Sequence, residues 1–184
     1  ISKWSNKFNM FDVLKISRTE IRHSNMLAWL IDPNESHGFE DSILRGILQN
    51  LIKNNEFKEI DAFKLLLMDF KSVTVFREKH NIDLLAVFEK ENFVLCIENK
   101  IGSGEHDNQL KRYTAIIEKE YPYFKKLFVF LTPDATEPSG DNWCLLSYTD
   151  LLQIISASKN RTKMQPDIEL LVDNYIDVIR RDIV

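Results

Sequence analysis

The sequence predicts a mixed α/β fold in which helices flank a central sheet. Apolar residues recur at helical spacing near both ends of the chain, whereas residues 73–97 are rich in the β-branched and aromatic residues that favour strands. Glycine and proline together supply 10 of 184 residues, about 5%, against a usual ~12%. Such sparse turn residues favour long elements over a sandwich of many short strands.

Two helices are expected ahead of the sheet. Residues 20–31 carry an apolar stripe at helical spacing, and Pro33 ends the run. Residues 39–52 repeat the pattern. The run 61–70 fits either a short helix or a buried strand, because periodicity does not separate the two over so short an apolar stretch.

Three consecutive strands are expected next, at 73–76, 82–88 and 93–97. The third is apolar at every position, so both of its faces should be covered and it should lie centrally in the sheet. The interval 89–92 is polar and predicts a hairpin in which the numbers of paired residues sum to 181.

The rest of the chain alternates between the two kinds of element. We expect a helix over 105–121, strands over 126–131 and 143–146, and helices near 149–156 and 166–181. With no internal repeat and no long linker, we expect one domain over residues 1–184. Because the sequence begins with Ile1, we also expect it to come from a processed or longer protein.

Charge and cysteine content exclude several classes of protein. The 24 basic and 28 acidic residues give a formal net charge of −4, which is not typical of a protein that coats a duplex, so any nucleic-acid site must be local. Cys96 and Cys144 lie too far apart for a zinc ribbon or a disulfide scaffold, which favours a reducing, cytoplasmic location. No stretch approaches the ~18 apolar residues of a membrane span, so no membrane partner is expected.

Charged residues converge where the second and third strands meet. In the expected register Asp83 faces Glu98, and Lys100 returns to the same face two residues later. Facing carboxylates repel unless a cation lies between them, and Mg²⁺ is held by one or two carboxylates while it keeps waters and phosphate oxygens. A nearby lysine stabilises charge on a phosphoryl group. The pattern therefore indicates metal-assisted hydrolysis of phosphodiesters.

A simple ion pair at a strand end is the competing interpretation. The spacing acid-any-Lys also occurs at 56–58 and 69–71, so it selects nothing by itself. Residues 98–100 differ because they follow a fully apolar strand and have an acid opposite them across a predicted hairpin.

Flanking helices offer further candidates. Glu20 is either a third carboxylate of the site or a first-turn residue favoured by the helix dipole. Gln109 is placed to orient a water or a phosphate, and Lys111 and Arg112 are placed to meet a nucleic-acid backbone. Tyr113 is either a platform on which a base stacks or, as its spacing favours, a core residue.

Five segments together resemble the PD-(D/E)XK nuclease superfamily, in particular a bacterial branch with Glu-x-x-His-Ser on the first helix. They are Glu20-Ile21-Arg22-His23-Ser24, Leu27-Ala28-Trp29-Leu30, Ile82-Asp83, Ile97-Glu98-Asn99-Lys100-Ile101 and Gln109-Leu110-Lys111-Arg112-Tyr113. The resemblance covers about residues 17–133, with 148–184 as a C-terminal helical extension. Ile82 replaces the proline of the family name, at a position that carries no ligand.

The resemblance implies a restriction-endonuclease-like core, with a three-strand antiparallel unit, a crossover helix and a further strand in one mixed sheet flanked by helices. It implies Asp83 and Glu98 as ligands of Mg²⁺ or Mn²⁺, Glu20 and the backbone carbonyl of Asn99 as further ligands, Lys100 as the catalytic lysine, and Gln109 as the polar residue of the following helix. His23 would contact substrate with Lys111, Arg112 and Tyr113, or would buttress Glu20 or pack as a satisfied core histidine.

We therefore expect a Mg²⁺- or Mn²⁺-dependent nuclease that acts on DNA rather than RNA, with a homodimer as the form that double-strand cleavage would require. The competing hypothesis is a catalytically silent nuclease-like domain that serves as a binding or assembly module in a larger defence or mobile-element protein. Metal binding by the carboxylates separates the two hypotheses.

Overall fold

The computed structural model describes residues 7–54, 60–102 and 108–184. Within these ranges the strands form one mixed sheet, in the spatial order β1 (Val73–Arg77), β2 (Leu84–Phe88), β3 (Phe93–Asn99), β4 (Lys125–Thr132) and β5 (Trp143–Ser147). β1, β2 and β3 are antiparallel neighbours, whereas β4 and β5 run parallel to β3. The expected mixed sheet is therefore confirmed.

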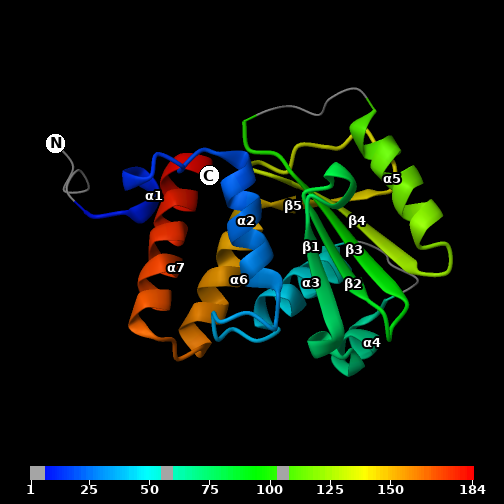
Figure 1. The fold of residues 1–184 in the computed structure, drawn as a ribbon, viewed down its shortest axis with the longest axis horizontal. Helices are drawn as coiled ribbons and strands as arrows, with labels where there is room; N and C mark the ends of the chain where they lie inside the picture. The colour runs from blue at the N-terminus through cyan, green and yellow to red at the C-terminus, as the bar shows by residue number, and fades with distance from the viewer. Residues whose placement is uncertain (1–6, 55–59, 103–107) are drawn as a thin grey trace.

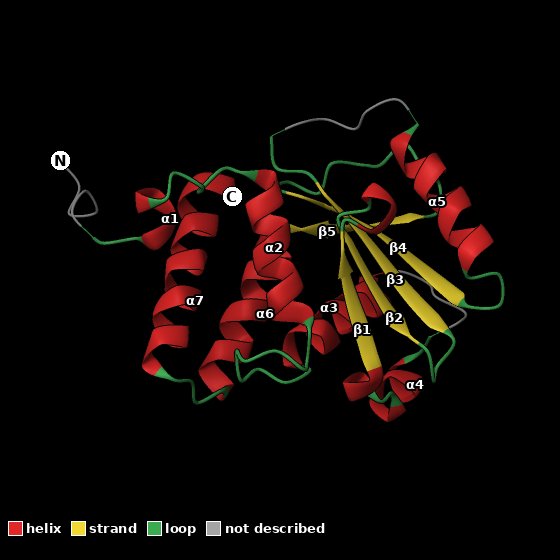
Figure 2. Cartoon of the chain, viewed as in Figure 1, coloured by secondary structure: helices red, strands yellow, loops and turns green. Residues whose placement is uncertain are grey.

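The helices lie on two sides of this sheet (Figures 1 and 2). On one side lie α2 (Glu20–Ile31), α3 (Ser42–Asn54), α6 (Tyr148–Arg161) and α7 (Pro166–Val178), with α7 packed outside α6, and on the other side lies α5 (Gln109–Glu120). The short helices α1 (Met10–Val13) and α4 (Ala62–Leu67) pack against α7 and α3 respectively. Each face of the sheet thus has its own buried apolar cluster.

The hairpin of β2 and β3 has the predicted register. Leu84 pairs with Ile97 and Phe88 with Phe93, so the paired numbers sum to 181. All 7 residues of β3 are buried, as expected for a central strand with covered faces. The parallel pairing of β3 with β4 requires a crossover connection, which α5 supplies.

Element boundaries near the hairpin differ from the expected ones for local reasons. The second strand begins at Leu84 rather than at 82, because the side chain of Asp83 accepts a hydrogen bond from the backbone N–H of Asn99 where the ladder would otherwise continue. The undecided run 61–70 contains α4, which ends before a 3₁₀ turn at Phe70–Ser72.

Four helices also differ from expectation. The helix expected near 149–156 spans Tyr148–Arg161. The helix expected over 39–52 begins at Ser42. The helix expected over 105–121 begins at Gln109, and 105–107 lie outside the described residues. The last helix ends at Val178 and continues as a π-helical turn through Ile179–Ile183.

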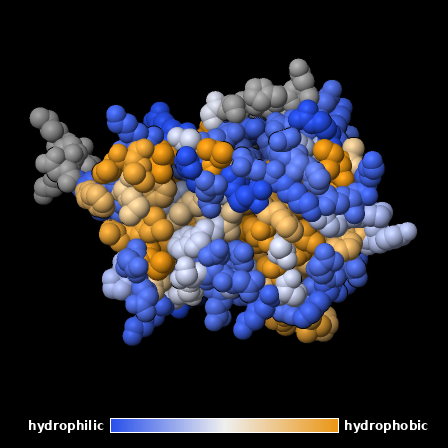
Figure 3. Space-filling view, in the orientation of Figure 1, coloured by the Kyte–Doolittle hydropathy of each residue, from blue (hydrophilic) through white to orange (hydrophobic). Residues whose placement is uncertain are grey.

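The surface in view divides by polarity. Apolar residues gather over α1 and α7, where Val13, Leu14 and Leu170 are exposed, whereas the surface over α5 is mostly hydrophilic (Figure 3). Among the helices within the described ranges, none combines the length and the apolar character that crossing a bilayer requires.

Gly46 permits the close approach of α3 to α6. A Cβ at this position would lie 2.7 Å from Cγ2 of Ile154. We expect Gly46→Ala to lower the free energy of unfolding by about 1–3 kcal/mol, because overpacking outweighs the higher helix propensity of alanine. Urea unfolding measures the change, with Gly102→Ala as the control, since nothing lies within 4 Å of a Cβ there. An unchanged midpoint for Gly46→Ala would contradict the packing of these two helices.

Candidate active site

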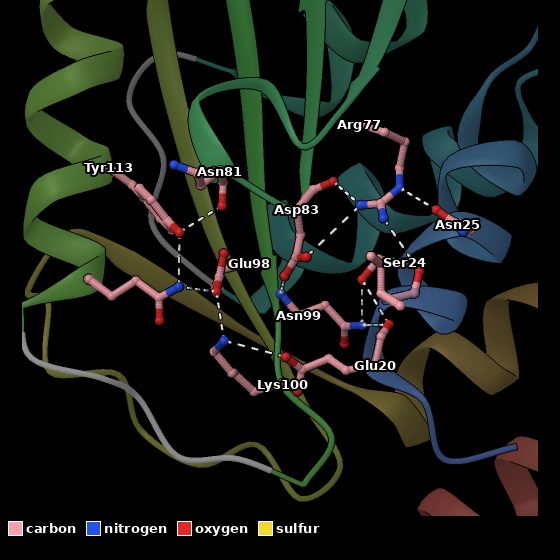
Figure 4. Close-up of polar contacts among 12 residues, drawn as sticks. Glu20, Ser24, Asn25, Arg77, Asn81, Asp83, Glu98, Asn99, Lys100 and Tyr113 are labelled. Atoms are coloured by element: carbon pink, nitrogen blue, oxygen red, sulfur yellow. Dashed lines mark hydrogen bonds and ion pairs between the residues drawn. The ribbon is translucent and has the colours of Figure 1, made fainter. Parts of the chain in front are cut away.

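Strand alternation sorts the polar residues at the end of β3 onto two faces. The apolar residues of β3 alternate between the cluster beneath α5 and the cluster beneath the four-helix layer. The same period of two puts Glu98 and Lys100 on the α5 face and Asn99 on the opposite face. By the alternation of β2, Asp83 also lies on the α5 face, beside Glu98 on the neighbouring strand (Figure 4).

Lys100 lies between two carboxylates. Its Nζ is 3.0 Å from Oε1 of Glu98 and 3.5 Å from Oε1 of Glu20, which enters from the first turn of α2. Oε2 of Glu20 accepts a hydrogen bond from the backbone N–H of Ile101 at 3.0 Å. Lys100 is 8% exposed and Glu98 is 1% exposed, so their ion pair is buried. Glu20 thereby joins α2 to the chain that follows β3.

Asp83 is held from two sides. Its Oδ2 accepts the hydrogen bond from the N–H of Asn99 at 2.9 Å. Arg77, at the end of β1, donates to the carbonyl of Asp83, and its guanidinium lies 3.9 Å from Oδ1 of the same residue. The guanidinium also donates to Oδ1 of Asn25 on α2 at 2.9 Å. Arg77 therefore ties Asp83 to the helix that carries Glu20.

Gln109, at the start of α5, contacts the cluster from the other side. Its Nε2 donates to Oε1 of Glu98 at 2.7 Å and to the hydroxyl of Tyr113 at 2.9 Å. The Tyr113 hydroxyl donates in turn to the carbonyl of Asn81 at 2.7 Å, in the turn between β1 and β2. The Tyr113 hydroxyl and Glu98 both accept a hydrogen bond here, so the Gln109 amide must point its NH₂ group toward them and its oxygen away. Oε1 of Gln109 is buried and has no hydrogen-bond partner among the described residues.

Burial and like charge dominate the electrostatics. Burial raises the pKa of Glu98, and the nearby charge of Asp83 raises it further, to about 7. Burial likewise raises the pKa of Asp83. Burial by itself would lower the pKa of Lys100, but the charges of Glu98, Glu20 and Asp83 outweigh it, and the pKa is raised. Three carboxylates around one ammonium group leave an excess of negative charge.

The donor set fits a hard divalent cation. Oε2 of Glu98 is buried and lacks a hydrogen-bond partner within the described part of the chain. In an extended strand the carbonyl of Asn99 lies on the same edge as its N–H, which contacts Asp83. Those ranges contain no group of three or more His, Cys, Asp or Glu side chains arranged to hold a metal. A site here would therefore rest on Asp83, Glu98 and main-chain oxygen, a set that suits Mg²⁺ with its retained waters.

Two candidate substrate-contacting residues, for which a core role was the alternative, are buried. His23 is 1% exposed, with Nε2 2.8 Å from the carbonyl of Ser17 and Nδ1 3.4 Å from the hydroxyl of Tyr175. Burial lowers the pKa of its imidazole. Tyr113 is 2% exposed, so its ring is not placed to stack on a base. The structure supports the core alternative for both residues.

Three contacting residues were missed from the sequence. The basic residue Arg77, close to the end of the predicted first strand, was a usable signal, because a buried carboxylate at a strand end needs partners. Asn81 contributes a backbone carbonyl, which no sequence pattern reveals. Tyr148 donates to Asn99 across 49 residues of sequence, and nothing in the sequence relates the two.

The raised pKa of Glu98 predicts how stability depends on pH in metal-free protein. Between the ordinary value of 4.5 and about 7 the unfolded chain ionises Glu98 while the folded chain keeps it protonated, so stability falls as pH rises through this window and then levels off. At ~1.4 kcal/mol per pKa unit, the fall amounts to a few kcal/mol. Urea unfolding in chelator at pH 4.5 to 8 should show this fall, and Glu98→Gln should flatten it. Identical profiles for both proteins would contradict the burial of this carboxyl.

Comparison with known families identifies the chain. The family model described as the PD-(D/E)XK nuclease superfamily matches residues 8–177, most of the 184-residue chain. A search of curated proteins found no match, and neither did a search of solved structures. The matched range contains the charged residues that surround Lys100, and it extends through α6 and most of α7. The chain belongs to the PD-(D/E)XK nuclease superfamily.

Proposed function

We propose that this protein is a metal-dependent nuclease that hydrolyses phosphodiester bonds. Hydrolysis adds water across one P–O bond and yields a phosphate monoester and an alcohol, so the site must stabilise negative charge and move protons. The observation that carries the proposal is the buried ammonium of Lys100 between Glu98 and Glu20, with Asp83 beside Glu98. A structural ion pair needs a single carboxylate, and burying more of them is costly unless a further cation offsets their repulsion.

Asp83 and Glu98 would hold Mg²⁺ or Mn²⁺, with the carbonyl of Asn99 and the carboxylate of Glu20 as further candidate ligands. When bound, such a cation supplies Lewis-acid stabilisation of the phosphoryl group and lowers the pKa of water. The hydrogen bond from Asn99 to Asp83 and the buried, unpartnered Oε2 of Glu98, as judged within the described residues, support this assignment.

Lys100 would act on the reacting phosphate. Its ammonium has three N–H donors, and its contacts with Glu98 and Glu20 use two of them. The third donor suits an attacking water or a phosphate oxygen. Gln109 would hold Glu98 through Nε2 and orient a water through Oε1.

DNA is the proposed substrate in preference to RNA, as the family resemblance implies. Lys111 and Arg112 are exposed on α5, next to Gln109, and supply local positive charge for a phosphate backbone. One such site cuts one strand, so we propose a homodimer for cleavage of both strands of a duplex.

Other expectations form part of the same proposal. The thiols of Cys96 and Cys144 are both free, which supports a reducing, cytoplasmic location. Residues of α6 and α7 share the buried cluster of α2 and α3, which supports one domain.

The segment 20–24 supports the bacterial branch of the superfamily. A catalytically silent module has less support, because a silent domain has no need to retain a costly buried charge cluster.

Substitution of the charged residues tests the proposed activity. We expect Lys100→Ala and Asp83→Ala each to reduce Mg²⁺- or Mn²⁺-dependent cleavage by about 10²-fold or more, because the first removes the ammonium that stabilises charge on the phosphate and the second removes a proposed metal ligand. The assay uses labelled single- and double-stranded DNA and RNA, and added chelator should stop cleavage. Lys71→Ala is the matched control, because Lys71 ends another acid-any-Lys segment and is exposed.

The controls show whether a variant loses activity because its chemistry is impaired or because it fails to fold. Circular dichroism should show that all three variants are folded, and Lys71→Ala should cleave at the wild-type rate. Wild-type rates for Lys100→Ala would contradict the role of the lysine. A wild-type protein that cleaves none of the four nucleic acids with either metal would contradict the proposed function.

A further inference from the structure

The side chain of Asn99 is completely buried and fully hydrogen-bonded. Its Oδ1 accepts from the hydroxyl of Tyr148 at 2.8 Å, and its Nδ2 donates to Oγ of Ser24 at 2.9 Å. The same Nδ2 lies 3.5 Å from the carbonyl of Glu20, to which Ser24 also donates. The carboxamide of Asn99 is therefore clamped between α6 and the first turn of α2.

Tyr148 is itself positioned by the fold. It is the first residue of α6 and follows Ser147, which ends β5 and caps the helix by accepting from the N–H of Asp150. Tyr148 is 0% exposed, and its hydroxyl contacts that of Tyr175 on α7. The donor that reaches Asn99 thus comes from a helix that begins at the same end of the sheet as the site, and its direction is set by rigid elements.

The main chain of Asn99 faces the candidate metal site. Its N–H donates to Oδ2 of Asp83, and its carbonyl lies on the same strand edge. Because both groups are joined through the Cα of Asn99, a shift of this residue's backbone would displace the carbonyl and weaken the contact with Asp83 together. The side chain points the other way, into the clamp formed by Tyr148 and Ser24.

We propose that Tyr148 is a positioning residue for the metal site, acting through Asn99 on Asp83 and on the carbonyl of Asn99. This inference rests on the proposed function, because it concerns the affinity of that site for a divalent cation. Partners that orient metal ligands without touching the metal typically contribute 10–100-fold to affinity. The C-terminal helices thereby take part in metal binding and do more than extend the core.

Mn²⁺ titration by calorimetry tests the inference without relying on activity. Tyr148→Phe removes one hydroxyl and keeps the ring, and we expect it to weaken Mn²⁺ binding about tenfold. Tyr121→Phe is the matched control: this tyrosine is also buried, but its hydroxyl contacts Lys79 at the far end of α5 and touches neither Asn99 nor Tyr148. We expect this variant to bind Mn²⁺ within about twofold of wild type, even where both variants lose several degrees in Tm.

A double-mutant cycle tests the route through Asn99. Asn99→Ala keeps the backbone carbonyl and removes the carboxamide. In that background Tyr148→Phe should change Mn²⁺ affinity no further, because the hydroxyl no longer has its acceptor. Additive losses in the double variant would show that Tyr148 acts by another route and would overturn the inference.

Two other results would also overturn it. Wild-type affinity in Tyr148→Phe would show that the hydroxyl does not position the site, while the proposed function would stand. Equal weakening in Tyr148→Phe and Tyr121→Phe, in proportion to their losses in Tm, would reduce the effect to general stability. Absence of Mn²⁺ binding by the wild-type protein would instead overturn the proposed function and the inference with it.

Discussion

The register of the β2–β3 hairpin is the constraint on which the site depends. Side chains alternate along a strand with a period of two, so a slip of one residue would turn Glu98 away from Asp83 and bury it against the four-helix layer. The pairs from Leu84 and Ile97 to Phe88 and Phe93 resist that slip, because apolar side chains fill both faces of the hairpin. Apolar packing along the two strands therefore determines which charged side chains meet at their ends.

The resulting cluster is costly to fold. Glu98 is almost completely buried, and its raised pKa reflects lost solvation and the charge of Asp83. Lys100 offsets part of this cost, and Arg77 supports Asp83 from the neighbouring strand. The two large apolar clusters offset the destabilising free energy of this site, as is common where a function requires a destabilising arrangement. A divalent cation would relieve the remaining repulsion.

Much of the fold could be predicted from hydrophobic patterning, since each sheet face and each helix stripe is specified locally. Asp83, Glu98 and Lys100 were brought together by period and hairpin register, which are also local. The environment of His23 was not predictable, because its burial depends on Tyr175, which is distant in sequence. The predicted strand boundary was wrong where a side chain replaces a backbone acceptor between strands, as the carboxylate of Asp83 does just before β2.

The difference between local patterns and contacts distant in sequence also explains which residues were missed. A clamp such as that of Tyr148 on Asn99 arises when the end of β5 is brought to the end of β3 through the intervening strand β4. No spacing rule records that approach, because it depends on the order of strands in the sheet. Arg77 is intermediate: its charge is visible in the sequence, but its partners on α2 become evident when helix and sheet pack together.

The position of Mn²⁺ in crystals soaked with the metal, located by anomalous scattering, is the most direct test of the central claim. We predict a peak between the carboxylates of Asp83 and Glu98, with oxygen atoms of both residues within about 2–2.5 Å of the ion. A well-ordered site without metal at saturating Mn²⁺, or a peak bound elsewhere on the chain, would contradict the claim that these carboxylates form a metal centre.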